Sequence, residues 1–204
     1  MRKLVVATKN RKKLSEIKTL LKGLDLKIIS LLDFSHPPSI KETGKTFKEN
    51  AVKKAVTIAR FSGLLTLGED SGLQVKALGG RPGVYSSRFS GAKKDDVLNN
   101  EKVLRLLGRL PLTKRKARYV CSVALADEDG LITTKEGTCY GRITFYPKGT
   151  NGFGYDPIFI VKGFKKTFGQ LSSATKHRLS HRGRALKKIK KDILAQIKNP
   201  HNSF

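Results

Sequence analysis

The stretch from Gly149 to Pro157 combines residue types that could hold a nucleobase. It contains three glycines, the aromatic side chains of Phe153 and Tyr155, and the carboxylate of Asp156. Glycines let the backbone approach a flat ligand closely and adopt positive φ. The rings offer faces for stacking, and the carboxylate accepts hydrogen bonds from an amine or amide edge. The alternative, a glycine-rich turn with both rings in the core, has equal weight on this stretch alone.

Residues 8–13 form a basic segment that could bind phosphate. Their order is Thr-Lys-Asn-Arg-Lys-Lys, between an expected strand and an expected helix. The N-terminus of a helix exposes unpaired N–H groups and a partial positive charge, which suits an anion. Thr8 and Asn10 can donate to phosphate oxygens, and Lys13 can reach one as a point charge. The alternative is an ordinary helix cap followed by surface lysines.

Adjacent carboxylates at Glu69 and Asp70 stand out because acidic residues are scarce, with 16 Asp and Glu against 42 Lys and Arg. Neighbouring side chains of an extended backbone point in opposite directions, so one carboxylate could face a metal ion while the other supports it. Mg²⁺ takes one or two carboxylates together with substrate phosphates and water. A carboxylate could also take the proton from a water that attacks phosphorus. The alternative is a plain Asp-Ser-Gly turn at residues 70–72, which in isolation is the commoner interpretation.

Two other groups of polar residues could contribute. Glu42 precedes an expected helix whose residues Asn50 and Lys54 share one face. Its carboxylate could hold a metal or simply favour the helix dipole. Near the C-terminus, His181 and Arg182 fall in the first turn of an expected helix, where the dipole disfavours cations unless an anion or a base edge is close. The alternatives are a capped helix with one buried polar contact, and a basic patch that opens a helix.

The net charge of +26 is extreme for 204 residues. It is typical of nucleic-acid binding through phosphate contacts, of a positive field that attracts a polyanionic small substrate, or of a solvated surface. The basic residues are spread along the whole chain and not gathered in a tail. This distribution favours the attracting field or the solvated surface over nucleic-acid binding. Nucleic acid is therefore an alternative partner that the charge alone does not favour.

Length and composition predict one domain over residues 1–204, long enough to bury a core without metal or disulfide support. Cys121 and Cys139 show neither metal spacing nor a disulfide framework, which indicates a reduced, cytoplasmic setting. No apolar run approaches the ~20 residues of a membrane span. The few apolar residues after Arg2-Lys3 are too short for a signal-peptide core, so a first strand is expected there.

The candidate residues must be positioned by an alternation of strands and helices. Strands are expected at residues 3–7, 26–32, 64–67, 73–76, 118–126, 131–138, 142–146 and 157–161. Apolar positions at helical spacing predict helices from Leu14 to Gly23 and at about 46–62, 95–107 and 180–197. Helices and strands alternate early, whereas hairpins cluster late. This order predicts a mixed sheet in an α/β fold.

Six motifs, taken in order, resemble those of the inosine triphosphate pyrophosphatase family. They are Ala-Thr-x-Asn-x-x-Lys at 7–13, Glu-Thr-Gly-x-Thr-Phe-x-Glu-Asn-Ala-x-x-Lys-Ala at 42–55, Glu-Asp-Ser-Gly-Leu at 69–73, Gly-x-Pro-Gly-Val-Tyr-Ser-Ser-Arg at 80–88, Gly-Thr-Asn-Gly-Phe-Gly-Tyr-Asp-Pro-Ile-Phe at 149–159, and Ser-His-Arg-Gly-x-Ala-Leu at 180–186. The resemblance covers nearly the whole chain.

The resemblance implies hydrolysis of non-standard purine nucleoside triphosphates (ITP, dITP and XTP) to the monophosphate and pyrophosphate, with Mg²⁺ as cofactor. It implies an elongated α/β fold with a mixed sheet flanked by helices, a central cleft between two lobes, and a homodimer. Asp70 would be the general base and a metal ligand, and Glu42 and Glu69 would help to place the metal. The implied substrate-binding residues are Thr8, Lys9, Asn10, Arg11, Lys12, Lys13, Lys54, Ser71, Phe153, Gly154, Tyr155, Asp156, Lys176, His181 and Arg182.

Within this set, Phe153 would stack on the base, and Lys176, His181 and Arg182 are suitable donors to a 6-oxo group. Two departures from the family pattern concern acids. The residues before Lys176 are Ala-Thr where Glu-Glu is common, and Lys41 stands where a second acid often precedes the first motif glutamate. Two alternatives remain, a basic nucleic-acid-binding protein on the same scaffold and, more weakly, a hydrolase of damaged pyrimidine nucleotides.

Overall fold

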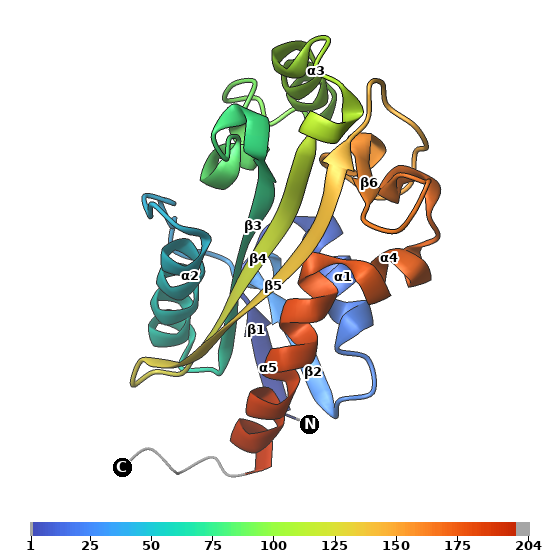
Figure 1. Cartoon of the computed structure of the whole chain (residues 1–204). Coiled ribbons are helices and arrows are strands. Elements are labelled where there is room, and N and C mark those ends of the chain that lie inside the picture. The colour runs from blue at the N-terminus through green and yellow to red at the C-terminus, as the bar shows by residue number, and fades with distance from the viewer. Residues whose placement is uncertain (1, 199–204) are drawn as a thin grey trace. The chain divides into compact units, whose positions relative to one another are not determined.

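The computed structural model describes residues 2–198, and six strands in that range form one mixed sheet (Figure 1). The strand order is β2-β1-β3-β4-β5-β6. β1 pairs in parallel with β2 and β3, whereas β5 and β6 are antiparallel. The strands are β1 (Arg2–Val6), β2 (Leu26–Ser30), β3 (Thr66–Val75), β4 (Lys116–Ala126), β5 (Leu131–Ile143) and β6 (Phe159–Val161). This arrangement confirms the mixed α/β fold expected from the sequence.

Five helices accompany the sheet in the described range: α1 (Arg11–Leu20), α2 (Phe47–Ser62), α3 (Asp96–Leu107), α4 (Ser173–Leu179) and α5 (His181–Lys198). Local signals set several of their ends. The Thr46 side chain accepts a hydrogen bond from the Glu49 N–H at the start of α2, and Gly63, with φ of 62°, ends that helix. A left-handed residue at this position favours glycine. None of these helices is both long and apolar enough to cross a membrane.

The contacts within the chain define two compact units, each assembled from separate segments. The first comprises the residues up to Asp70, 121–137, and those from Arg182 onward, and the second comprises 71–120 and 138–181. β3, β4 and β5 each contribute residues to both units.

In the first unit, helices pack on both faces of the sheet (Figure 1). Ala51 and Ala55 of α2 pack against Ala124 of β4. The next β4 residue, Leu125, belongs to a different apolar cluster that includes α1 and α5 residues such as Ile189. Because successive strand residues point to opposite faces, α2 covers one face and α1 with α5 covers the other.

The second unit has its own core, built around aromatic rings. Tyr119 of β4 lies 4.8 Å from Phe159 and 6.2 Å from Phe168 between ring centroids. Val103 and Leu107 of α3 are buried in the same cluster. Both units therefore have an apolar core of their own, which fixes the polar side chains that each presents.

Two of the expected elements are wrong, and one helix was not expected. Residues 70–72 are not a turn but lie inside β3, which joins the two short strands expected on either side. Of the strand expected at 142–146, only residues 142 and 143 are in a strand, at the end of β5, which runs without a break from Leu131 to Ile143. α4, a short helix directly before α5, was not expected. The remaining expected helices and strands are present with ends shifted by a few residues.

Candidate active site

Asp70 lies on β3, and two α2 side chains hold its carboxylate. Lys54 Nζ is 2.9 Å from Asp70 Oδ1, and Asn50 Nδ2 donates to Asp70 Oδ2 at 3.2 Å. Glu42, from the segment before α2, pairs with the same Lys54 amine at 2.5 Å. Gly68 allows β3 to come this close, because a Cβ there would lie 2.1 Å from a backbone carbonyl oxygen of α2.

The two charged groups of this pair influence each other's proton affinity. Burial raises the pKa of Asp70 above its usual range, and the nearby Lys54 and Lys13 amines offset only part of that effect. Burial alone would lower the pKa of Lys54, but attraction to Asp70 and Glu42 raises it overall. Lys54 therefore carries its charge at neutral pH, and Asp70 is a stronger base than an exposed aspartate.

The carboxylate of Glu69 makes a different set of contacts. Lys13 Nζ lies 2.8 Å from Glu69 Oε2, and Arg182 Nη2 donates to Glu69 Oε1 at 3.1 Å. Arg182 also pairs with Glu16 of α1. Burial disfavours the Arg182 charge, but the two carboxylates outweigh this and raise its pKa. The Cys121 thiol is 3.4 Å from Glu69 Oε1, and burial raises its pKa, so it stays protonated.

The basic segment 8–13 forms the N-terminus of α1. Asn10 Oδ1 accepts hydrogen bonds from the backbone N–H groups of Lys12 and Lys13 at 3.0 and 3.1 Å. Thr8 Oγ1 accepts one from the Asn10 N–H at 3.1 Å. Lys13 is partly buried beside Glu69, whereas three other cations of the segment are exposed: Lys9, Arg11 and Lys12.

In the second unit, the buried Asp156 organises the loop that contains Phe153. Its Oδ2 accepts from the Phe153 N–H at 2.8 Å and from Lys176 Nζ at 2.5 Å. Lys176 Nζ also lies 4.7 Å from the centroid of the Phe153 ring. Gly152, with φ of 80°, is required here because a Cβ would lie 2.0 Å from Asp156 Oδ2. The structure thus brings together the ring, amine and carboxylate that the sequence singled out.

Three other expected site residues of the second unit, Tyr155, His181 and Ser71, lie in different surroundings. Tyr155 is buried in the apolar core, and its hydroxyl donates to the Ser86 carbonyl at 2.7 Å. This position matches the core interpretation of that ring. His181 stacks on Tyr119 with ring centroids 4.5 Å apart and planes 5° from parallel. Ser71, the neighbour of Asp70 on β3, is half-buried.

Sequence reasoning missed two α3 residues that hold the same loop. The Asp96 carboxylate accepts from the Gly154 N–H at 2.8 Å, and Asn100 Nδ2 donates to the Gly154 carbonyl at 3.0 Å. Residues four apart share a helix face, so together they hold the N–H and the carbonyl of Gly154, which belong to the peptide groups on either side of its Cα. Gly154 itself has φ of 64°. Nothing in the sequence indicated these contacts, because Gly154 lies 58 residues beyond Asp96 and 54 beyond Asn100.

Two carboxylates of the first unit, those of Glu42 and Asp70, could hold a metal. Within residues 2–198 there is no group of three or more His, Cys, Asp or Glu placed to hold an ion. Glu42 and Asp70, however, both contact the Lys54 amine, so their carboxylates lie close together. Mg²⁺ needs only one or two carboxylates when substrate phosphates and waters complete its shell. This pair therefore fits Mg²⁺ bound together with a triphosphate.

Comparison with known proteins identifies the family. The model of the Ham1 family matches residues 4–192. This chain belongs to the Ham1 family. A dITP/XTP pyrophosphatase of Bacillus cereus is 48% identical over 195 residues, covering 95% of each chain. The dITP/XTP pyrophosphatase of Shouchella clausii is 50% identical over 193 residues, covering 95% of this chain and 97% of that protein.

The fold agrees with solved Ham1 structures. A HAM1 protein from Coxiella burnetii superimposes with a TM-score of 0.86 and 39% identity, covering 96% of this chain and all of the other. These findings confirm the resemblance drawn from the six sequence motifs. In this Ham1 chain the motif residues collect into two groups, one around Asp70 and Glu69 in the first unit and one around Asp156 in the second.

Proposed function

We propose that this Ham1 chain hydrolyses non-standard purine nucleoside triphosphates, namely ITP, dITP and XTP, to the nucleoside monophosphate and pyrophosphate. Relatives named dITP/XTP pyrophosphatase, which align over almost the whole length, support this reaction. The observation that carries the chemistry is the buried Asp70 carboxylate, which Lys54 and Asn50 hold from α2. A carboxylate whose pKa is raised by burial beside specific charged partners is typical of a functional site.

Cationic groups of the first unit would bind the triphosphate. Lys54 and Lys13 are each oriented by carboxylates, so their amines are pre-positioned as point charges. Thr8 and Asn10 lie at the start of α1, where the helix dipole favours an anion. The exposed cations of the same segment would add to the positive field that attracts the substrate.

Asp70 would take the proton from the water that attacks the α-phosphorus, with pyrophosphate as the leaving group. Lys54 and Lys13 would stabilise the negative charge that develops on the phosphate oxygens. Glu42 and Asp70 would hold Mg²⁺, which supplies further charge neutralisation at those oxygens. Glu69 would support this arrangement indirectly, since its carboxylate orients Lys13 and Arg182.

Groups of the second unit would recognise the base. Phe153 would stack on it, and Lys176, fixed by Asp156, would donate to the 6-oxo group. His181, held flat against Tyr119, would be a second donor. A 6-amino group would leave such donors unpaired, and a site of this kind discriminates strongly between bases.

The other expected site residues would have supporting roles. Gly154 would contribute through its backbone, and Ser71 would touch the substrate beside Asp70. Tyr155 would hold the loop through its bond to Ser86, and the ion pairs of Arg182 favour a positioning role for its guanidinium.

We also propose that residues 1–204 act as one domain, that the chain forms a homodimer, and that it works in the cytoplasm on the nucleotide pool. The family match over residues 4–192 supports the single domain. Sedimentation equilibrium would test the assembly, with a mass near twice the 22.6 kDa of one chain expected.

Product analysis in oxygen-18-labelled water tests the proposed reaction. Attack on the α-phosphorus places the label in the nucleoside monophosphate and leaves the pyrophosphate unlabelled. Label in the pyrophosphate, or release of inorganic phosphate with a nucleoside diphosphate, would overturn the proposal. The same reaction with the Asp70→Asn protein measures the background.

A further inference from the structure

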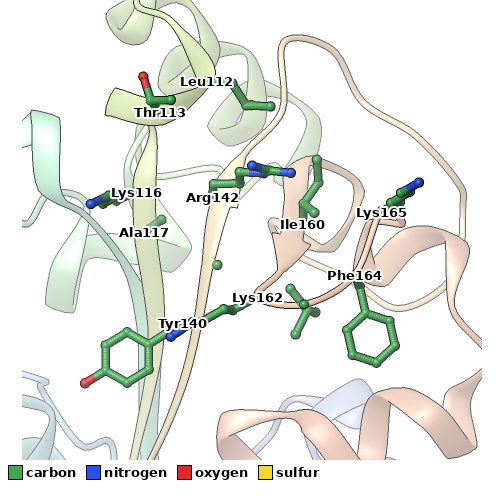
Figure 2. A pocket seen from close by; sticks show the side chains of 13 residues that line it. Leu112, Thr113, Lys116, Ala117, Tyr140, Arg142, Ile160, Lys162, Phe164 and Lys165 are labelled. Atoms are coloured by element: carbon green, nitrogen blue, oxygen red, sulfur yellow. The ribbon is translucent and has the colours of Figure 1, made fainter.

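A pocket of about 750 Å³ in the second unit takes no part in the proposed reaction. Figure 2 shows its lining side chains, which come from the turn before β4, from β4, β5 and β6, and from the segment that follows β6. A smaller pocket of about 440 Å³ shares three lining residues with it: Lys116, Ala117 and Tyr140. The two pockets are therefore adjacent, and we call them together the cationic groove.

Six cations line the cationic groove: Lys76, Lys116, Arg118, Arg142, Lys162 and Lys165. Among the described residues, neither pocket is lined by Asp or Glu, and none of these six side chains has an ion pair. The second unit as a whole carries nineteen Lys and Arg against four Asp and Glu. The groove is thus a concentrated part of a strongly positive surface.

The placement of these cations does not serve the stability of the fold. Ile143 donates its backbone N–H to the Arg115 carbonyl at 2.9 Å, which joins the end of β5 to the start of β4. Lys116, the first residue of β4, therefore lies opposite Arg142, the residue of β5 that precedes Ile143. Like charges opposite each other on a sheet are destabilising. Arg118 is held in place by a hydrogen bond from its Nε to Gln74 at 2.8 Å. An anionic ligand would remove the repulsion, which points to a binding role.

An aromatic side chain lies where the two pockets meet. Tyr140 of β5 is 53% exposed and lines both of them. Phe164, after β6, is half-buried at the edge of the larger pocket. Exposed aromatic rings on a sheet, together with cations along it, are the means by which single-stranded nucleic acids are bound without strong sequence preference.

We infer that the cationic groove binds a single-stranded polynucleotide, with the cations on its phosphates and Tyr140 stacked on a base. A single phosphate does not need six cations, whereas six cations along two adjacent pockets match a repeating polyanion. A second copy of this chain fits poorly, because a two-fold contact would bring the same cations against one another. This binding is independent of the proposed hydrolysis, since none of the groove residues belongs to the candidate active site.

Fluorescence anisotropy with a labelled oligothymidylate of about 20 nucleotides, longer than the ~4–16 that one site covers, tests the inference over a series of salt concentrations. For a single strand, each phosphate contact contributes about 0.7 to the slope of log affinity against log salt. The double variant Lys116→Ala/Arg142→Ala is expected to lower that slope by about 1.4. Tyr140→Ala is expected to weaken binding by about 5- to 150-fold without changing the slope.

A matched control removes two charges elsewhere. Lys187→Ala/Lys191→Ala changes two exposed lysines of α5 and should leave the slope unchanged. An equal loss of slope in both double variants would show binding by the overall field and overturn the inference. So would an absence of binding by the unaltered chain, equally tight binding of a duplex of the same length, or a change in sedimentation mass of the groove variant, which would identify a second copy as the occupant. Turnover of ITP by each variant, measured separately, reports on the proposed function alone.

Discussion

Replacing Asp70 by asparagine removes the charge of this carboxylate while keeping its shape. Lys54 and Asn50 each donate to one of its oxygens, at 2.9 and 3.2 Å. An amide has one oxygen, so Asp70→Asn keeps one of these bonds and loses the other, at a cost of about 0.5–3 kcal/mol.

The raised pKa of Asp70 works in the opposite direction. A carboxyl whose pKa is higher in the folded state stabilises the fold at pH values below its unfolded pKa, and this contribution is lost as pH rises through the folded pKa. At neutral pH the contribution is already absent, because burial disfavours the charged form. The neutral amide avoids that penalty. Because the two effects oppose each other, we expect a net change of about 1 kcal/mol or less, which is about 2–4 °C in Tm for a chain of this size.

The effect on turnover should be far larger. Loss of a positioned general base typically lowers the rate by about 10²- to 10⁴-fold, or about 3–5 kcal/mol in the barrier. The assay is pyrophosphate release from saturating ITP, alongside thermal unfolding of the same preparation. Asp25→Asn, an exposed aspartate of the same unit, is the control and should match the unaltered chain. Near-normal turnover by the folded Asp70→Asn protein would refute the general-base assignment, and a large fall in Tm would refute the energetic reasoning.

Three further changes probe the site. Phe153→Ala should raise the KM for ITP by about 5- to 150-fold through loss of stacking; an unchanged KM in steady-state kinetics would exclude that role. Lys54→Met removes the cation that lowers the pKa of Asp70, so the acid limb of the residual pH–rate profile should move to higher pH, and an unmoved limb would contradict the coupling. Asn100→Ala frees the Gly154 carbonyl and should raise KM more than it lowers kcat, whereas equal losses would indicate a general structural effect.

Sequence patterns predict the helices of this chain where the signals are local. α2 was expected at 46–62 and runs from Phe47 to Ser62, because a threonine cap and a left-handed glycine mark its ends. α3 was expected at 95–107 and runs from Asp96 to Leu107, after the Asp95 cap. These signals lie within a few residues of the ends they set, so they can be recognised without knowledge of the fold.

The turn expected at residues 70–72 is wrong for a physical reason. Asp-Ser-Gly favours turns in isolation, but here the segment lies in β3, between β1 and β4 in the sheet. Pairing with β1 involves Thr66 and Leu67, and the strand continues beyond them beside β4. Tertiary context therefore overrides the local turn preference of residues 70–72. α4 escaped prediction because its residues, Ser173–Leu179, lack apolar residues at helical spacing.

The site residues also divide into those that the sequence identifies and those that only the fold reveals. The types and spacing of Asp70, Lys54 and Asp156 identified them as candidates, and the resemblance assigned their roles. Glu16 and Asp96 could not be found in this way, because their partners lie 166 and 58 residues away along the chain. Only the folded arrangement brings these supporting carboxylates to Arg182 and to the Phe153 loop.

The most direct test of the central claim is pyrophosphate release from ITP, dITP and XTP, compared with ATP and GTP, with Mg²⁺ and with a chelator in its place. We expect rapid release from the first three alone, and its loss in the chelator, because charge neutralisation at the phosphates would be removed. Equal rates with ATP would contradict the proposed recognition of the 6-oxo group. Absence of release from every nucleotide in the presence of Mg²⁺ would contradict the account as a whole.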